Sequence, residues 1–209
     1  MNERVFLPHK KKKLTSFQII ILGFLGVILL GTVFLMLPVS TRAGTATPFA
    51  DALFTSTSAV CVTGLVLHDT ATYWSFFGQV VILFLIQIGG LGVITVAASF
   101  AMISGRKISL MQRSTMQDAI SAPKVGGIVR LTRFILRGTF LIELLGALSM
   151  LPVFCRDYGW RGVWMAVFHS ISAFCNAGFD ILGTESNRYP SLTGYAGSPV
   201  INITIMLLI

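Results

Sequence analysis

Two segments of the chain repeat one pattern of small, polar and cysteine residues, and both segments end on a glycine. The segment FTSTSAVCVTG at 54–64 and the segment FHSISAFCNAG at 168–178 share six of eleven residues at an offset of 114. Glycine allows backbone carbonyls to face a common axis without a Cβ clash, and a ring of carbonyls can replace the hydration shell of a monovalent cation. Gly64 and Gly178 therefore predict a cation site built from backbone oxygens.

The elements that position these glycines are predicted to be membrane helices. Of the 209 residues, 54% are hydrophobic and only 11% are charged, and the mean hydropathy is +0.80. Soluble domains carry about 25% charged residues. The net charge of +8 is explained by the Lys and Arg that gather in cytoplasmic loops of membrane proteins, so it does not require nucleic acid as a partner. The sequence predicts an all-α protein in the lipid bilayer.

The apolar stretches differ in length. A spanning helix needs about 20 apolar residues, so we predict spans within 15–37, 74–102 and from 138, with Pro38 ending the first and Pro152 ending the apolar run 138–154. Thr47-Pro48 is typical of an N-cap followed by proline at the first helical position. Two apolar stretches are too short to span, and a further apolar run begins at Pro199. The two short stretches are 49–58 and 162–174.

The charges in the loops predict the orientation. The opposite loops hold four basic residues, whereas the N-terminus and the 104–137 loop hold twelve, which are Arg4, Lys10, Lys11, Lys12, Lys13, Arg106, Lys107, Arg113, Lys124, Arg130, Arg133 and Arg137. Because cytoplasmic loops collect Lys and Arg, the N-terminus is predicted to be cytoplasmic. Both short segments then enter and leave the membrane on the external side, as re-entrant half-helices.

The repeating unit is therefore a span, a half-helix, a glycine loop and a second span, in the same orientation in both copies. The sequence MLPV at 36–39 and at 150–153 follows the same offset of 114. A half-helix that ends within the membrane points the negative end of its dipole at the bilayer centre. We divide the chain into a basic N-terminus, a first repeat, a basic linker and a second repeat that ends within its closing span, at 1–13, 14–103, 104–137 and 138–209.

The sequences CVTGL at 61–65 and SAFCNAGF at 172–179 resemble the pore loops of the Trk/Ktr/HKT superfamily of cation transporters, with IGGLG at 88–92 in support. The resemblance is closest to the membrane subunit of bacterial Ktr systems. It implies four repeats around a pseudo-fourfold pore of the K+-channel type, of which this chain would supply the N-terminal two. The implied function is K+ uptake, passive or assisted by Na+, across the bacterial inner membrane.

The resemblance also implies particular residues and partners. By this resemblance, a selectivity filter binds K+ through backbone carbonyls, and the residues that supply them are Val62, Thr63, Gly64, Asn176, Ala177 and Gly178. The residues that flank the filter, at the ends of the two half-helices, are by the same resemblance Ser58, Cys61, Ser172 and Cys175. The expected partners are a second copy of the chain and a cytosolic, ring-forming regulatory subunit that binds nucleotide. No cofactor is expected in this chain.

The main alternative from another class is a membrane-embedded hydrolase or transferase that uses His169, or His68 with Asp69, beside the repeated serines. Such an enzyme needs a nucleophile, an oriented base and a third group, and no such arrangement is indicated. We therefore predict no enzyme activity, and we expect the serines to bond the half-helices to neighbouring spans. These serines are Ser56, Ser58, Ser170 and Ser172. A fragment that inserts without conducting is the other alternative.

The remaining candidates have ordinary interpretations. Gly89, Gly90 and Gly92 are typical of close helix packing or a local break, and the repeated cysteines are interpreted as small packing residues. Glu143 is the only acid inside a span, so it is predicted either to join a proton or gating path or to pair with basic groups near the cytoplasmic end, such as Arg137. The external acids are predicted to attract cations or to stay solvated, and they are Asp51, Asp69, Asp180 and Glu185.

Overall fold

The computed structural model describes residues 15–93, 95–96, 110–119, 127–187 and 190–209, and these residues form helices joined by loops. In chain order the elements are α1 (Ser16–Met36), the short 3-10 helix η1 (Pro38–Ser40), α2 (Phe49–Val60), α3 (Phe76–Leu91), α5 (Leu110–Ala119), α6 (Ile128–Tyr158), α7 (Arg161–Phe174), the 3-10 helix η2 (Ser191–Tyr195) and α8 (Pro199–Leu208). The predicted all-α class is confirmed. The N-terminal segment 1–13 and much of the basic linker, with Lys107 and Lys124, lie outside the described residues.

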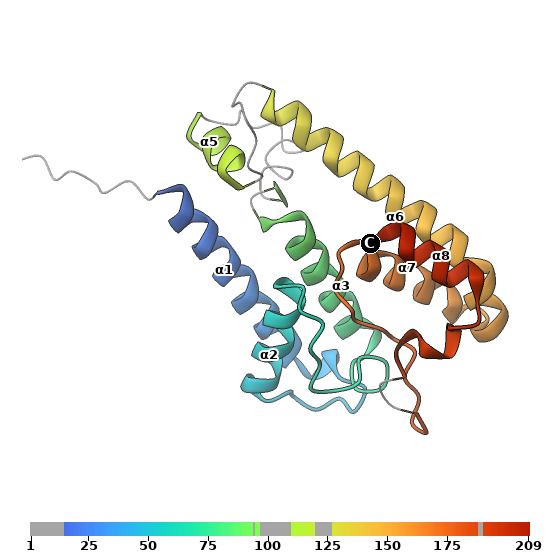
Figure 1. The fold of residues 1–209 in the computed structure, drawn as a ribbon. Coiled ribbons are helices and arrows are strands. Elements are labelled where there is room, and N and C mark those ends of the chain that lie inside the picture. The colour runs from blue at the N-terminus through green and yellow to red at the C-terminus, as the bar shows by residue number, and fades with distance from the viewer. Residues whose placement is uncertain (1–14, 94, 97–109, 120–126, 188–189) are drawn as a thin grey trace, which may run out of the picture.

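The helices form two groups of three that lie side by side (Figure 1). One group contains α1, α2 and α3, the other contains α6, α7 and α8, and the contact between α3 and α7 joins them. Helix α5 lies close to the beginnings of α1 and α6. We call the opposite end, where α1 ends and α2, α3 and α7 begin, the loop end. The two short helices α2 and α7 thus start at the loop end and run into the molecule.

The longest helices have the composition of membrane spans. Within the described residues, α1 and residues 129–158 of α6 are long and apolar enough to cross a bilayer, and α3 and α8 are shorter apolar helices. Large apolar side chains such as Leu22, Leu25 and Val33 are exposed on α1. An exposed helix that is apolar all round is stable in lipid rather than in water. The fold therefore agrees with the membrane protein that the composition predicts.

The first group begins almost where the sequence predicts. Thr15 caps α1 by accepting a hydrogen bond from the Gln18 amide, and the Gln18 side chain accepts one from the Thr15 amide. Helix α1 ends before Pro38, as expected from the restriction that proline places on the preceding residue. The predicted cap of α2 is wrong by one residue, because Pro48 itself occupies the N-cap position. Thr47 is instead buried and accepts a hydrogen bond from the Tyr73 hydroxyl.

Two predicted helix limits differ from the structure. Pro152 does not end the third span, because α6 continues through it to Tyr158. Proline removes one backbone donor from a helix, and packing of α6 against α7 and α8 keeps the helix intact past that position. The predicted span 74–102 is interrupted, because α3 ends at Leu91 and Gly92 has a φ of 81°. Residues 97–102 of that prediction lie outside the described residues.

The two groups are repeats of one arrangement, with a register that changes along the chain. The ends of α2 and α7 are equivalent at the offset of 114, since their C-caps are Cys61 and Cys175. In the first spans the offset is 115, because Gly31 and Gly146 make the same contacts with a half-helix serine and a leucine of the closing helix. The MLPV match at 114 is therefore one residue out of structural register. From the span glycine to the half-helix serine, the second repeat is one residue shorter than the first, while α6 extends further than α1 and leaves only residues 159–160 between α6 and α7.

Candidate functional site

The first half-helix ends in a hydrogen-bonded turn that starts the glycine loop. Cys61 is the C-cap of α2, and the next two amides turn back onto the helix. The Val62 amide donates to the Ala59 carbonyl at 3.3 Å, and the Thr63 amide donates to the Ser58 carbonyl at 3.0 Å. This pair of bonds is a Schellman motif, in which the residue after the C-cap adopts the left-handed conformation.

The second half-helix ends in the same turn. Cys175 is the C-cap of α7, the Asn176 amide donates to the Ala173 carbonyl at 2.8 Å, and the Ala177 amide donates to the Ser172 carbonyl at 2.7 Å. Each bond is equivalent to one in the first repeat at the offset of 114. The repeated sequence therefore specifies a repeated backbone conformation as well as a repeated helix.

Both loops have positive φ angles at every second residue. Val62 has a φ of 57° and Gly64 one of 74°, while Asn176 has 56° and Gly178 has 71°. When left-handed and right-handed residues alternate, successive amides point to one side of the chain and successive carbonyls to the other. Asn tolerates this conformation, but a β-branched valine rarely adopts it. Val62 is thus held in a strained conformation at the beginning of a candidate site.

The two loops meet at their glycines. An ideal Cβ added to Gly64 would lie 2.7 Å from the Ala177 carbonyl oxygen and 3.5 Å from the Gly178 Cα. A Cβ added to Gly178 would lie 3.6 Å from the Gly64 Cα, which is an ordinary contact. The fold therefore brings together two predicted site segments that lie 114 residues apart in the sequence. The two glycines are not equivalent, because a side chain would meet a carbonyl oxygen at Gly64 but not at Gly178.

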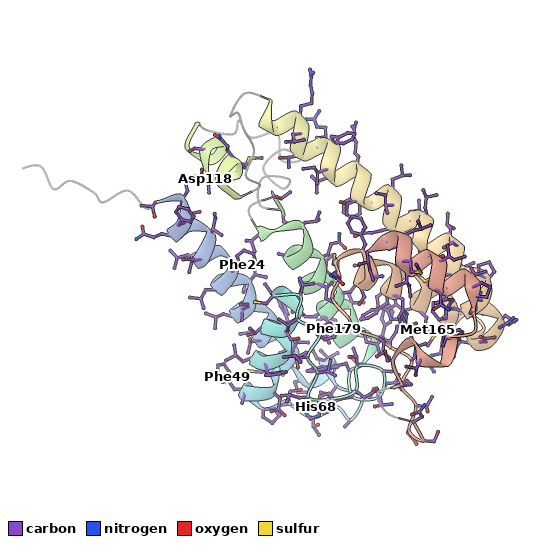
Figure 2. All side chains as sticks on the ribbon, in the orientation of Figure 1. Phe24, Phe49, His68, Asp118, Met165 and Phe179 are labelled. Carbon is purple, nitrogen blue, oxygen red and sulfur yellow. The ribbon has the colours of Figure 1, made fainter. Side chains whose placement is uncertain are left out.

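The residue after the second glycine anchors its loop in the core. Phe179 is almost fully buried, and Figure 2 shows it near the middle of the molecule, between the two groups of helices. The Ser172 hydroxyl donates to the Phe179 carbonyl at 2.7 Å. In the first repeat, the hydroxyl of Ser58 is hydrogen-bonded to that of Thr63 at 2.9 Å. These two serines bond to their own loops, so the prediction that they bond to neighbouring spans is wrong.

The other two repeated serines do bond to neighbouring spans, as predicted. The Ser56 hydroxyl donates to the Ile28 carbonyl of α1 at 2.8 Å, and the Ser170 hydroxyl donates to the Glu143 carbonyl of α6 at 2.6 Å. Both serines are fully buried. Each half-helix is therefore attached to the first span of its own repeat by an equivalent hydrogen bond.

Two adjacent glycines of α3 contact the ends of both half-helices. The position of a Cβ on Gly89 is occupied by the Val60 carbonyl of α2, and that of a Cβ on Gly90 by the Cys175 side chain after α7. Small residues let helices approach closely in a membrane. The packing interpretation of Gly89 and Gly90 is confirmed, and Gly92 instead ends the helix. Cys175 is a free thiol in this contact, as its packing interpretation predicts.

The acid inside the third span pairs with an amide rather than with a base. The Gln87 side chain of α3 donates from Nε2 to Oε1 of Glu143 at 2.8 Å. Glu143 is buried, whereas Arg137 is exposed, so the predicted Glu143–Arg137 pair is wrong. A buried polar group in a membrane needs such a partner. The bond connects the two repeats, and Gln87 was not among the residues singled out from the sequence.

The histidines do not complete a hydrolytic site in the described part of the chain. Nδ1 of His169 is hydrogen-bonded to the Met165 carbonyl at 2.7 Å, one turn earlier in α7. The neighbouring Ser170 hydroxyl is already bonded to α6. His68 pairs with Asp51 at 2.9 Å, so the suggested His68–Asp69 arrangement is not formed. None of these contacts joins a nucleophile to a base as hydrolysis requires.

One of the acids after the glycine loops, Asp69, contacts the second repeat at the loop end. Asp69 accepts hydrogen bonds from the amide and the hydroxyl of Thr72, both at 2.8 Å, and its carboxylate also contacts Gly183 of the second repeat. Burial raises the pKa of Asp180 above the usual range of a carboxyl group, and the nearby Asp69 adds to the shift. Glu185 is exposed. Asp69 therefore has a structural role as well as a charge.

Together, these features define a class of protein. It is a helical membrane protein in which two short helices end in equivalent glycine loops that meet at Gly64 and Gly178, an arrangement that could present backbone carbonyls to a cation. The family of cation transport proteins called TrkH matches residues 8–209. The chain belongs to this family.

The chain is also similar to several transport proteins over most of its length. It is 43% identical over 174 residues to the potassium/sodium uptake protein NtpJ of Enterococcus hirae, covering 83% of this chain and 39% of that protein. It is 41% identical over 198 residues to the Ktr system potassium uptake protein B of Bacillus subtilis, covering 94% and 42%. The corresponding protein of Vibrio alginolyticus is 35% identical over 189 residues, covering 90% and 40%. The chain thus spans about two fifths of the length of these curated relatives.

Proposed function

We propose that this chain is part of the membrane subunit of a Trk/Ktr-type system that takes up K+ across the bacterial inner membrane. The transported ion would be K+, with Na+ as a second ion. The support comes from the family, from relatives named as potassium or potassium/sodium uptake proteins, and from the site geometry. As in the sequence-based prediction, the chain supplies two of four repeats around one pore. No enzymatic step is part of the function.

The ion would be held by the backbone carbonyls of Val62, Thr63 and Gly64 in the first loop and by those of the corresponding residues in the second loop, Asn176, Ala177 and Gly178. One observation carries this assignment. The two loops have positive φ angles at equivalent residues, and they approach so closely that a Cβ at Gly64 would meet the Ala177 carbonyl oxygen. Because carbonyls replace water around the ion, the side chains at these positions need not be polar. Ser58, Cys61, Ser172 and Cys175 would support the loops without binding the ion.

The orientation, organisation and partners are proposed with the same function. The N-terminus is cytoplasmic, several helices cross the membrane, and the loop end is external, in keeping with the greater number of Lys and Arg in 1–13 and 104–137. The repeats occupy 14–103 and 138–209. Relatives from Bacillus subtilis are named as parts of a Ktr system, and we assign to this chain a homodimeric arrangement and a cytosolic regulatory ring that binds nucleotide.

Transport measurements on the full-length protein test this proposal. Proteoliposomes with Gly64→Ser are expected to lose K+ uptake or to lose the preference for K+ over Na+, because a side chain there meets the Ala177 carbonyl. Proteoliposomes with Ser170→Ala are expected to keep both, since Ser170 contacts the first span and not the loop. Unchanged flux in Gly64→Ser together with loss of flux in Ser170→Ala would contradict the filter assignment.

A further inference from the structure

A cavity of about 340 Å³ lies at the loop end, between the beginnings of α3 and α7. Two arginines, Arg42 and Arg161, line it together with aromatic side chains of Phe76, Trp160 and Trp164. Arg42 comes from the segment after α1, Phe76 from α3, and the others from the beginning of α7. The cavity therefore lies at the junction of the two repeats.

The polar groups beneath the cavity are already hydrogen-bonded to one another. The Trp164 indole donates to Oε1 of Gln79 at 2.9 Å, which joins α7 to α3. The Gln79 amide nitrogen in turn donates to the carbonyls of Thr70 and Trp74, at 3.2 Å and 3.4 Å. The side-chain nitrogen and oxygen of buried Gln79 are thus both hydrogen-bonded within the protein, so Gln79 is not expected to bind a ligand. The charged donors that line the cavity belong to Arg42 and Arg161.

The two arginines have spare donors and uncompensated charge. Arg42 donates from Nε to the Trp74 carbonyl at 3.4 Å, which leaves its terminal nitrogens for another acceptor. Among the described residues, the salt bridges are His68–Asp51 and Arg156–Asp157, so neither cavity arginine is in one. The cavity lining in this part of the chain contains no acidic residue. A guanidinium presents a planar fork of donors that fits a phosphate, so the cavity favours an anion.

The position of the cavity identifies the kind of anion. It lies at the level where α1 and α6 end and α3 begins, which is the depth of lipid headgroups for helices that cross a bilayer. Trp160 is 91% exposed and Phe76 is 65% exposed beside the arginines. Exposed aromatic rings are typical of the membrane interface, where one side of the ring contacts acyl chains. A soluble anion would leave these rings exposed to water.

We propose that this cavity binds the phosphate of an anionic phospholipid from the leaflet at the loop end. Arg42 and Arg161 hold the phosphate, and Trp160 and Phe76 contact the glycerol and the first methylenes of the acyl chains. The bound lipid contacts both repeats, at the junction that the Trp164–Gln79 hydrogen bond already closes. The lipid thus adds to the contact between α3 and α7, the two helices that connect the halves of the molecule.

Lipid binding to the purified full-length transporter tests the proposal. Native mass spectrometry would follow the titration of detergent-solubilised protein with phosphatidylglycerol, with phosphatidylcholine as the zwitterionic comparison. The test variant is Arg42→Gln with Arg161→Gln. The matched control is Arg156→Gln, because Arg156 is an exposed arginine near the same end of α6 that pairs with Asp157 instead of lining the cavity. Size-exclusion profiles of all variants verify folding and oligomeric state.

The expected result is tighter binding of phosphatidylglycerol than of phosphatidylcholine by the wild type. Removal of both charges weakens phosphatidylglycerol binding about 30-fold, since each basic residue near an anionic lipid contributes about 1 kcal/mol. Arg156→Gln keeps the wild-type affinity, and the double substitution by lysine keeps part of it, because the charge remains and the fork is lost.

Three results would overturn the proposal. The first is equal phosphatidylglycerol affinity in the wild type and the Arg42→Gln, Arg161→Gln variant. The second is displacement of the lipid by inorganic phosphate at equal concentration, which would assign the cavity to a soluble anion. The third is a change in oligomeric state in the double variant alone, which would assign the cavity to an interface between copies of the chain.

Discussion

The contact between the two glycine loops predicts that Gly64 and Gly178 respond differently to the same substitution. Alanine at either position adopts a left-handed conformation at a cost of about 1–2 kcal/mol, because the φ angles are 74° and 71°. Only at Gly64 does the new methyl group also lie 2.7 Å from the Ala177 oxygen, whereas ordinary contact begins at 3.4 Å. The two atoms must therefore separate by about 0.7 Å in a closely packed region.

This displacement moves a carbonyl that we assign to the ion. Overpacking of a closely packed site costs about 1–3 kcal/mol, and the part of this cost that falls on the K+-bound state lowers K+ affinity, by up to about 150-fold when all of it does. Gly64→Ala is therefore expected to lower K+ affinity and the preference for K+ over Na+ by up to that factor relative to Gly178→Ala. The glycine in α6 with open space around it, Gly138, provides a control, and Gly138→Ala should transport like the wild type.

The assay is the uptake of a rubidium tracer by proteoliposomes that contain the full-length protein, with K+ or Na+ as the competing ion. Competition curves give the affinity of each variant for both ions, and the amount of inserted protein corrects for losses in folding. An equal loss in Gly64→Ala and Gly178→Ala would refute the reasoning from the Ala177 contact. A larger loss in Gly178→Ala would refute it more strongly, because that methyl group has an ordinary distance to its nearest atom.

Three further substitutions test the supports of the loops. Gly89→Ala places a methyl group against the Val60 carbonyl, so it should displace the first loop and reduce K+ selectivity in the same flux assay; unchanged selectivity would show that the close approach is unimportant. Ser170→Ala removes one interhelical hydrogen bond and should destabilise the protein by about 0.6–1 kcal/mol in a denaturant titration, with selectivity retained. Gln87→Leu leaves buried Glu143 without its amide donor and should lower the free energy of unfolding by about 1–3 kcal/mol. A second substitution, Glu143→Leu, should restore part of that stability. Unchanged stability in Gln87→Leu would contradict the proposed pairing.

Much of the helical architecture follows from the sequence, because a membrane leaves few choices for the backbone. Apolar length predicts α1 and the beginning of α8, and the small size of two other segments predicts half-helices close to those observed in α2 and α7. The repeated FxSxSAxCxxG pattern predicts equivalent loops, and the two Schellman turns are equivalent bond by bond. Local sequence and the absence of water in the bilayer together determine these features.

The differences arise where distant contacts decide the local structure. Pro152 remains inside α6 because α7 and α8 pack along that helix, and proline alone cannot indicate such support. The offset of 114 places the MLPV segments in register, but the contacts of Gly31 and Gly146 require 115. A pattern of identical residues does not reveal that the chain from the span glycine to the half-helix serine is one residue shorter in the second repeat.

In the candidate site too, local sequence predicts the position of the loops, whereas contacts between distant residues decide their detailed structure. The glycine loops could be predicted from their pattern, but the positive φ of Val62 could not, because valine rarely adopts it. The sequence suggests a basic partner for Glu143, yet Gln87 forms the bond across 56 residues of chain. Hydropathy patterns do not encode which polar residues of two helices face each other.

We propose that the paired glycine loops bind the transported ion through their backbone carbonyls. Anomalous scattering from crystals of the full-length protein soaked in thallium(I) or rubidium salts, which substitute for K+, tests it directly. We expect an anomalous peak bordered by the carbonyl oxygens of residues 62–64 and 176–178. Strong peaks elsewhere in the pore, with none beside these carbonyls, would contradict it.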